Sequence, residues 1–177
     1  MLKKIKEIYG YREMIFSLVK RDLRGRYKAS VLGFLWTFIN PLCQILVYTF
    51  VFQFIMRTGI EQFSVYLISG MIPWIFFSTA VSGGTMCIKN QSEMVKKIYF
   101  PREVLPISFV TSAFVNMLFC FIMIFLVIAV SGRGFNAVAL LFLPLVMIIE
   151  YIMALGFTFI VSGLTIYFRD MEHIVGV

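Results

Sequence analysis

Four long apolar stretches dominate the hydrophobic pattern of the chain, and only the fourth contains an acidic or basic residue. A helix needs roughly 20 apolar residues to cross a bilayer, and four ranges reach that length: 31–56, 65–88, 107–130 and 137–168. The sequence lacks the alternating ten-residue segments of membrane barrels, so we expect these spans to be helices. Hydrophobic residues make up 60% of the chain, and its mean hydropathy is +0.92. A soluble domain of 177 residues cannot bury that much apolar surface. The sequence therefore predicts an all-α integral membrane protein.

The N-terminal arm has a different pattern, in which apolar residues recur at helical spacing between lysines and arginines. The apolar positions are Ile5, Ile8, Ile15, Leu18, Val19 and Leu23. This pattern is typical of a helix that lies in the membrane interface, with its apolar side toward lipid and its bases against lipid phosphates. Gly10 can divide it in two. We expect residues 1–30 to form this amphipathic interface helix and residues 31–177 to form the transmembrane domain. The alternative is a solvated charged arm, which the regular apolar spacing disfavours.

The distribution of basic residues predicts the orientation in the membrane. Of the 16 lysines and arginines, all but two lie in the arm, in the 89–106 connection or at position 169; the exceptions are Arg57 and Arg133. The positive-inside rule then places the N-terminus and the 89–106 connection in the cytoplasm. The same rule accounts for the net charge of +7 without a nucleic-acid partner.

Catalytic motifs are missing from the sequence. It has no GxxxxGK[ST] phosphate loop, and its single histidine, His173, excludes an HExxH zinc motif. Neither a pair of carboxylates nor a Ser/His/Asp set falls within helical reach. Cys43, Cys87 and Cys120 lie in apolar spans without a CxxC pair, so we expect them to be small buried residues. We therefore expect no enzyme activity and no catalytic, metal or cofactor residues.

Two features inside the spans stand out. Glu150 lies near the middle of the fourth span, where a charge costs on the order of 2.5 to 3.5 kcal/mol by insertion scales. It either faces a water-filled path or gating contact, or it is protonated or hydrogen-bonded to a neighbouring helix for packing alone. The small residues of 78–85 predict a close helix-packing face, within one chain or between two copies.

The 89–106 connection ends in the stiff, charged sequence KKIYFPREVLP. We expect Pro101 and Pro106 to exclude one continuous helix through 101–106. Residues 92–98 are expected to form a short helix with Ser92 as its N-cap. A short helix followed by a stiff corner between two spans is suited to receiving force from a cytosolic partner. The alternative is a solvated loop that serves topology only.

Three stretches together resemble a known family: KRDLRGRYKASVLGFLWTFINPL (20–42), KKIYFPREVLP (96–106) and IYFRD (166–170). They are similar to the membrane subunits of ABC-2-type polysaccharide exporters. The residues that match are Arg21, Asp22, Arg26, Tyr27, Ser30, Gly33, Trp36 and Pro41 in the first stretch, Tyr99, Phe100, Pro101, Arg102 and Glu103 in the second, and Tyr167, Phe168, Arg169 and Asp170 in the third.

The resemblance implies an assembly and a function. Two permease copies would pair with two cytosolic ABC ATPase subunits and move a lipid-linked glycan across the bacterial cytoplasmic membrane, with ATP bound by the partner. The implied ATPase contacts are Tyr99, Phe100, Pro101, Arg102 and Glu103, with Arg169 and Asp170 at a second cytoplasmic contact. The family has six spans, so we expect this four-span chain to lack the last two. The alternatives are an ABC-2 permease for a drug or lipid, and an ion-coupled secondary transporter that uses Glu150.

Overall fold

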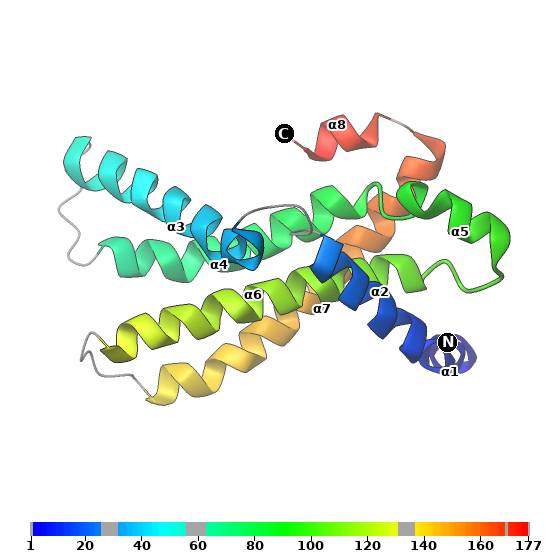
Figure 1. Cartoon of the computed structure of the whole chain (residues 1–177), viewed down its shortest axis with the longest axis horizontal. Helices are drawn as coiled ribbons and strands as arrows, with labels where there is room; N and C mark the ends of the chain where they lie inside the picture. The colour runs from blue at the N-terminus through cyan, green and yellow to red at the C-terminus, as the bar shows by residue number, and fades with distance from the viewer. Residues whose placement is uncertain (1, 26–31, 56–62, 131–136, 169, 177) are drawn as a thin grey trace.

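The protein is built from helices that run between two ends of an elongated bundle (Figure 1). The computed structural model describes residues 2–25, 32–55, 63–130, 137–168 and 170–176, and none of these residues forms a strand. The α-helices are α1 (Leu2–Gly10), α2 (Arg12–Gly25), α3 (Trp36–Thr49), α4 (Phe63–Gly84), α5 (Ser92–Lys97), α6 (Val104–Val130), α7 (Ala137–Tyr167) and α8 (Met171–Val175). Short 3-10 helices cover Gly33–Leu35 and Lys89–Gln91, and a π-helix, η2, covers Phe50–Ile55. The predicted all-α class is confirmed.

Three of the four predicted spans are single α-helices long and apolar enough to cross a membrane, with apolar windows at Leu67–Gly84, Val104–Ile122 and Leu140–Tyr167. The first predicted span differs. The 14-residue helix α3 passes directly into the six-residue η2, so the prediction of one uninterrupted α-helix over 31–56 is wrong. At the junction the Phe50 amide donates to the carbonyls of both Leu46 and Val47.

The ends of two spans near the 89–106 connection also shift. Helix α4 ends at Gly84 rather than at residue 88, and α6 begins at Val104 rather than at residue 107. Pro106 therefore lies inside the first turn of α6, where amide groups have no intrahelical acceptor and a missing N–H costs little. Because α6 starts between the two prolines, no single helix runs through 101–106, and the predicted interruption at this corner is confirmed.

The bundle core lies between α4, α6 and α7. Its buried members recur every three or four residues on α4 and α6, and seven residues apart on α7: Ile72, Phe76 and Ala80; Val110, Ala113, Met117 and Cys120; Met147 and Ala154. Aromatic rings extend this core, because Phe114 meets Phe76 and Tyr151 in edge-to-face geometry at centroid distances of 5.6 and 5.1 Å. Lipid is as apolar as these side chains, so close packing rather than escape from water holds such a bundle together.

Two adjacent glycines set the spacing of the bundle at the end of α4. A Cβ on Gly83 would collide with the ring of Phe109 on α6, and a Cβ on Gly84 would collide with the side chain of Thr158 on α7. The Thr158 hydroxyl then donates to the Ala80 carbonyl at 3.1 Å. The predicted packing face of small residues is confirmed, and it acts within one chain.

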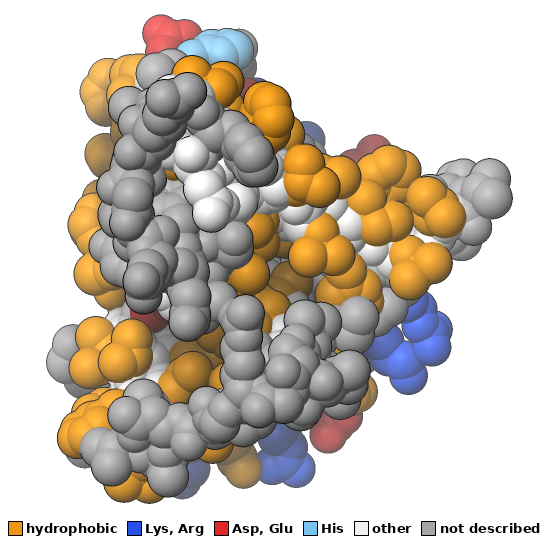
Figure 2. All heavy atoms as spheres, turned by 90° about the vertical axis from the view of Figure 1, so that its left-hand side faces the viewer, with side chains coloured by type: hydrophobic (Ala, Val, Ile, Leu, Met, Phe, Trp, Pro, Cys, Tyr) orange, Lys and Arg blue, Asp and Glu red, His pale blue; other side chains and the backbone are white. Residues whose placement is uncertain are grey.

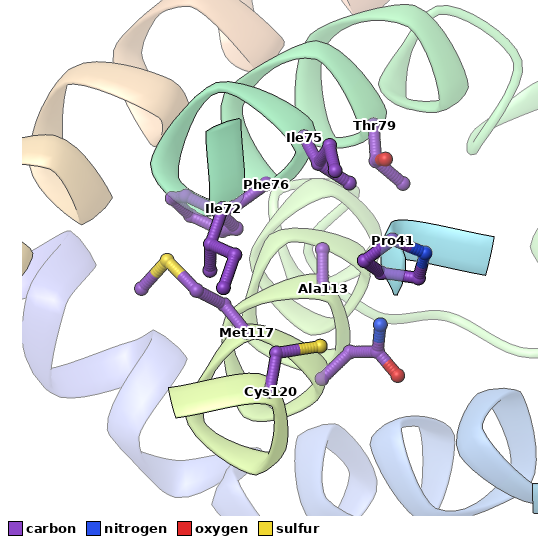
Figure 3. Close-up of a pocket in the computed structure, with 9 residues that line it drawn as sticks. Pro41, Ile72, Ile75, Phe76, Thr79, Ala113, Met117 and Cys120 are labelled. Atoms are coloured by element: carbon purple, nitrogen blue, oxygen red, sulfur yellow. The ribbon is translucent and has the colours of Figure 1, made fainter. Parts of the chain in front are cut away.

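A second polar contact joins α3 to α6 beside a small cavity of about 30 Å³ (Figure 3). Pro41 points toward this cavity from α3, opposite Ile72 and Phe76 of α4 and Cys120 of α6. A proline has no amide for the carbonyl four residues earlier, here that of Thr37. The Cys120 thiol lies 3.6 Å from that carbonyl and donates to it. Cys120 and Cys87 are buried as expected, whereas Cys43 is exposed, because it lies on the outer side of α3.

Large apolar side chains cover the outside of the bundle. They include Leu141, Ile149, Ile152 and Ile160 along α7 and Leu46 on α3. Figure 2, which looks onto the end opposite α1 and α5, shows mostly hydrophobic side chains among the described residues, with lysines and arginines only toward the edge of the view. Such a surface suits contact with lipid and confirms the integral membrane class.

The glycine contacts generate a stability prediction. Gly84→Ala should lower the free energy of unfolding by roughly 1–3 kcal/mol, because the added methyl group forces α4 and α7 apart. Gly70→Ala on the same helix is the matched control, since its Cβ would meet nothing within 4 Å. It should be neutral or slightly stabilising. Unfolding in mixed micelles measures both variants, and equal stabilities would contradict the close approach of α4 and α7.

Candidate functional site

The N-terminal arm folds as two helices that dock on the bundle. The chain turns at Tyr11, directly after Gly10, so the predicted division of the arm is confirmed. Helix α2 packs against α6, and Leu18 and Val19 are buried there. Part of the apolar side of the arm is thus covered by protein, and the expectation that this side faces lipid is wrong for α2. Residues 26–30 of the predicted arm lie outside the described residues.

A hydrogen bond between α2 and α6 fixes this docking. The Ser112 hydroxyl of α6 donates to the Asp22 carboxylate of α2 and also lies 2.9 Å from the Phe109 carbonyl. Ser112 is completely buried, and a buried hydroxyl without a partner costs roughly 1–3 kcal/mol. Hydrogen bonds to an ionised acceptor are about twice as strong as neutral ones. The pair therefore links an arm that is otherwise basic to the start of a membrane-spanning helix.

A second hydrophobic core lies where α2 meets the segment between α5 and α6. Its buried members are Leu18, Phe100, Val104 and Leu105, and the half-buried Tyr11, Met14, Ile15, Ile88, Met94 and Val95 pack around them. We call this set the elbow cluster. It joins the N-terminal helices, α5 and the start of α6 into one packed unit. Residues 98–103 are thus held by side-chain packing against α2 and the start of α6, and not only by the stiffness of Pro101.

The five predicted contact residues of the elbow divide into two groups. Phe100 is only 7% exposed and belongs to the elbow cluster, whereas Tyr99 is 92% exposed. Arg102 is also exposed, and Pro101 is half-buried. The backbone leaves α5 in an extended conformation at Ile98, with φ −130° and ψ 132°, and residues 102–103 form a turn before α6. The structure therefore turns Tyr99 and Arg102 outward and uses Phe100 as an anchor.

Glu103, the fifth contact residue, pairs with the N-terminal helix. Lys4 of α1 donates to the Glu103 carboxylate at 3.2 Å, and the two side chains are 76% and 38% exposed. A hydrogen bond from its own backbone amide is the main cause that lowers the pKa of Glu103. Partial burial opposes that shift, and the hydrogen bond and charge of Lys4 add to it. Glu103 is thus a charged internal tie between α1 and the elbow.

The short helix before the elbow is confirmed, with a different cap. Helix α5 covers Ser92–Lys97, one residue shorter than predicted. Ser92 is its first residue rather than its N-cap, because the preceding 3-10 helix places Gln91 at the cap position, and no side chain caps the helix. The expectation for Ser92 is therefore wrong.

The remaining candidate residues lie away from the elbow. Arg169 is outside the described residues, and the exposed Asp170 precedes α8, which packs against α4 and α7. There the Ser82 hydroxyl donates to the Val175 carbonyl at 3.4 Å. Glu150 is half-buried on α7, and no hydrogen bond or ion pair joins it to another described residue. The predicted hydrogen bond to a neighbouring helix is therefore not seen in the described part of the chain.

The sequence analysis did not predict two side-chain pairs of this region, Asp22 with Ser112 and Glu103 with Lys4. It matched Asp22 and Glu103 to the family without finding their partners. The partners are separated by 90 and 99 residues. One local signal existed: Ser108 and Ser112 are four residues apart at the start of an apolar helix, so they share one face that requires polar partners.

A comparison with protein families matches residues 13–177 to the ABC-2 type transporter family. The chain belongs to this family. The resemblance read from its motifs is therefore confirmed. The family and the relatives below are transporter permease subunits, which are not themselves enzymes.

Named relatives of this ABC-2 chain are export proteins. It is 37% identical to the O-antigen export system permease protein RfbA of Myxococcus xanthus over 175 residues. This aligned region covers 99% of this chain and 67% of the relative. A Klebsiella pneumoniae protein of the same name is 32% identical over 173 residues, 97% of this chain and 67% of the relative. The polysialic acid transport protein KpsM of Escherichia coli is 27% identical over 168 residues, 90% and 62% of the two chains. The chain thus spans about two thirds of the length of these relatives.

The Lys4–Glu103 pair of the ABC-2 chain generates a pH prediction. Because the pKa of Glu103 is lowered, the pair stabilises docking of α1 above the ordinary glutamate pKa of about 4.3, and this contribution is lost as pH falls through the lowered pKa. Glu103→Gln should speed amide exchange in residues 2–10 at pH 7 by at most about fivefold, since exposed pairs contribute roughly 0.2–1 kcal/mol. The difference from the unmodified protein should shrink as the pH falls through the lowered pKa of Glu103.

Glu13→Gln is the matched control for this exchange experiment. Glu13 lies on the N-terminal helix α2, and its side chain is 89% exposed. Its carboxylate lies 3.8 Å from the guanidinium of its neighbour Arg12. Its removal should leave exchange in α1 unchanged. Identical exchange in Glu103→Gln and the unmodified protein at pH 7 would show that Glu103 does not hold α1.

Proposed function

We propose that the chain is the membrane subunit of an ABC exporter that moves a lipid-linked polysaccharide out across the bacterial cytoplasmic membrane. The observation that carries the proposal is the 37% identity to an O-antigen export permease over 99% of the chain. Energy comes from ATP hydrolysed on a separate cytosolic subunit, as in the ABC-2 export systems to which the relatives belong. A second permease copy completes the assembly. The N-terminus and the elbow face the cytoplasm, which the surplus of lysine and arginine on that side supports.

The geometry of the elbow supports coupling to the ATPase. Tyr99 and Arg102 project outward from a segment that the elbow cluster holds in place, so a push on them displaces the ends of α2 and α6 rather than a loose loop. Exposed tyrosine and arginine side chains are the residue types that most often dominate protein interfaces. We assign Tyr99 and Arg102 to the ATPase contact, and Phe100 and Glu103 to internal transmission of the force. Asp170, with Arg169, belongs to a second cytoplasmic contact beside α8.

A double substitution tests this assignment. Tyr99→Ala with Arg102→Ala should weaken binding of the ATPase roughly tenfold or more and reduce polysaccharide export to a similar degree, because interface hot spots cost about 2 kcal/mol or more. Both side chains are exposed, so the amount of inserted protein and its unfolding transition should not change. Co-purification with the ATPase and ATP-dependent export in the same cells provide the measurements.

The N-terminal arm offers a control of the same composition and spacing. Tyr9 and Arg12 are exposed, and the Arg12 guanidinium lies 5.2 Å from the centre of the Tyr9 ring. Tyr9→Ala with Arg12→Ala should leave ATPase binding and export intact. Normal export in the Tyr99/Arg102 variant, or equal loss in both double variants, would refute the elbow as the ATPase contact.

A further inference from the structure

A cavity of about 110 Å³ lies between α2, the turn after α4 and the start of α6. It is distinct from the small cavity of Figure 3 and from the outward face of the elbow. Its lining comprises Leu18, Arg21 and Asp22 from α2, Gly83, Cys87, Asn90 and Gln91 from the end of α4 and the following turn, and Leu105, Ser108 and Phe109 from α6. The elements that form it are those joined by the Ser112–Asp22 hydrogen bond and the elbow cluster. Its position is therefore fixed by the same contacts that dock α2.

The cavity is large enough for a small organic ligand. By this measure a single water needs about 10–15 Å³, so the space holds several groups of that size. Its walls combine apolar side chains with a few polar groups that converge from three elements, as ligand sites do. The bundle cavity at about 30 Å³ is much smaller and lies deep in the spanning region.

The polar groups of the lining point to a neutral ligand rich in hydroxyl groups. Asn90 and Gln91 each carry an amide donor and an amide acceptor, and Arg21 supplies only donors. Asp22 balances the charge of Arg21, so the pair adds no net charge to the lining. The pair therefore provides no net electrostatic attraction for a phosphate. Vicinal hydroxyl groups of a sugar, which donate and accept in alternation, match this mixed set.

The apolar wall suits the same ligand. The Phe109 ring packs directly against Gly83, where any side chain would collide with it, so the ring is held at this edge of the cavity. Aromatic rings present an electron-rich face to the polarised C–H groups of a sugar ring. Leu18 and Leu105 continue the apolar wall. The lining thus combines apolar side chains with groups that can form hydrogen bonds, as a pyranose requires.

We propose that this cavity binds one neutral sugar unit of the glycan at the end of the bundle that carries α1 and α5. The assignment of the glycan as cargo rests on the proposed function, whereas sugar binding itself is a property of the cavity. Occupancy bridges α2, α4 and α6, the helices that the elbow connects to the ATPase contact. The site therefore reports the presence of a glycan to the coupling segment before transport.

Binding of simple glycosides to the full-length chain tests the proposal. The probes are the methyl glycosides of glucose, galactose, mannose and rhamnose, observed by saturation-transfer difference NMR in micelles of a detergent without a sugar head group. At least one glycoside should give a saturable signal. Asn90→Leu with Gln91→Leu should weaken its binding about tenfold or more, because both amide groups are lost. Asn40→Leu with Gln44→Leu, which removes an exposed asparagine and glutamine from α3, should leave binding unchanged.

Three results would overturn the sugar site: no saturable signal with any glycoside, equal binding in the two double variants, or displacement of the bound glycoside by inorganic pyrophosphate. The single variant Asn90→Ala, on an exposed residue, replaces the double variant if the latter does not fold, and the same outcomes apply. The experiment needs neither ATPase nor export. If the Asn90/Gln91 variant loses glycoside binding in micelles but still supports polysaccharide export in cells, the role of this site is refuted alone. If the unmodified protein binds a glycoside but supports no polysaccharide export, the proposed function is refuted alone.

Discussion

The hydrogen bond from the Ser112 hydroxyl to the Asp22 carboxylate joins the N-terminal helices to the membrane-spanning bundle. Ser112 is completely buried in α6, where its hydroxyl reaches both the Phe109 carbonyl of the same helix and the Asp22 carboxylate. Helix α2 supplies a carboxylate from an otherwise basic stretch, while Leu18 and Val19 fill the space beside it. A helix that would otherwise rest on the membrane surface is thereby fixed to a spanning helix. The elbow cluster and the polar cavity both depend on that position.

Because α2 is docked on the bundle, the elbow packs against a fixed helix. Phe100 is anchored between α2 and α6, and Glu103 is tied to α1 through Lys4. Tyr99 and Arg102 remain outside. Under the proposed coupling, a displacement at these two side chains would reach α1, α2 and α6, because the elbow is packed or paired with all three helices. Farther along the bundle, Gly83 and Gly84 bring α4 into close contact with Phe109 of α6 and Thr158 of α7. This arrangement fits a permease subunit whose energy arrives from another chain.

The sequence was sufficient for the features that depend on local pattern. Hydropathy located α6 and α7 within a few residues, and the small residues before position 85 predicted the packing that Gly84 makes with Thr158. The same patterns could not show that α3 passes into a π-helix at Phe50, because hydropathy depends on composition and does not report the hydrogen-bond register of a helix. They also placed the start of α6 after Pro106, because they do not show that a helix tolerates a proline in its first turn.

The contacts on which the proposed function depends were harder to predict from the sequence, because they join residues about 90 or more positions apart. Family motifs marked Asp22, Phe100 and Glu103 as a set, but only the packing separates the anchors from the exposed Tyr99 and Arg102. The polar cavity is likewise a product of three elements, and no single stretch of sequence contains its donor and acceptor set. Glu150 drew attention as an isolated charge, yet its half-buried position on α7 lies apart from this site.

A double-mutant cycle on Asp22 and Ser112 tests the docking of α2 most directly. The free energy of unfolding in mixed micelles is measured for the unmodified protein, Asp22→Ala, Ser112→Ala and the double variant. Docking through this hydrogen bond predicts a coupling energy of roughly 1–3 kcal/mol, so that the second substitution costs much less once the first is made. Additive effects within about 0.5 kcal/mol would show that the two side chains do not interact and would contradict the account.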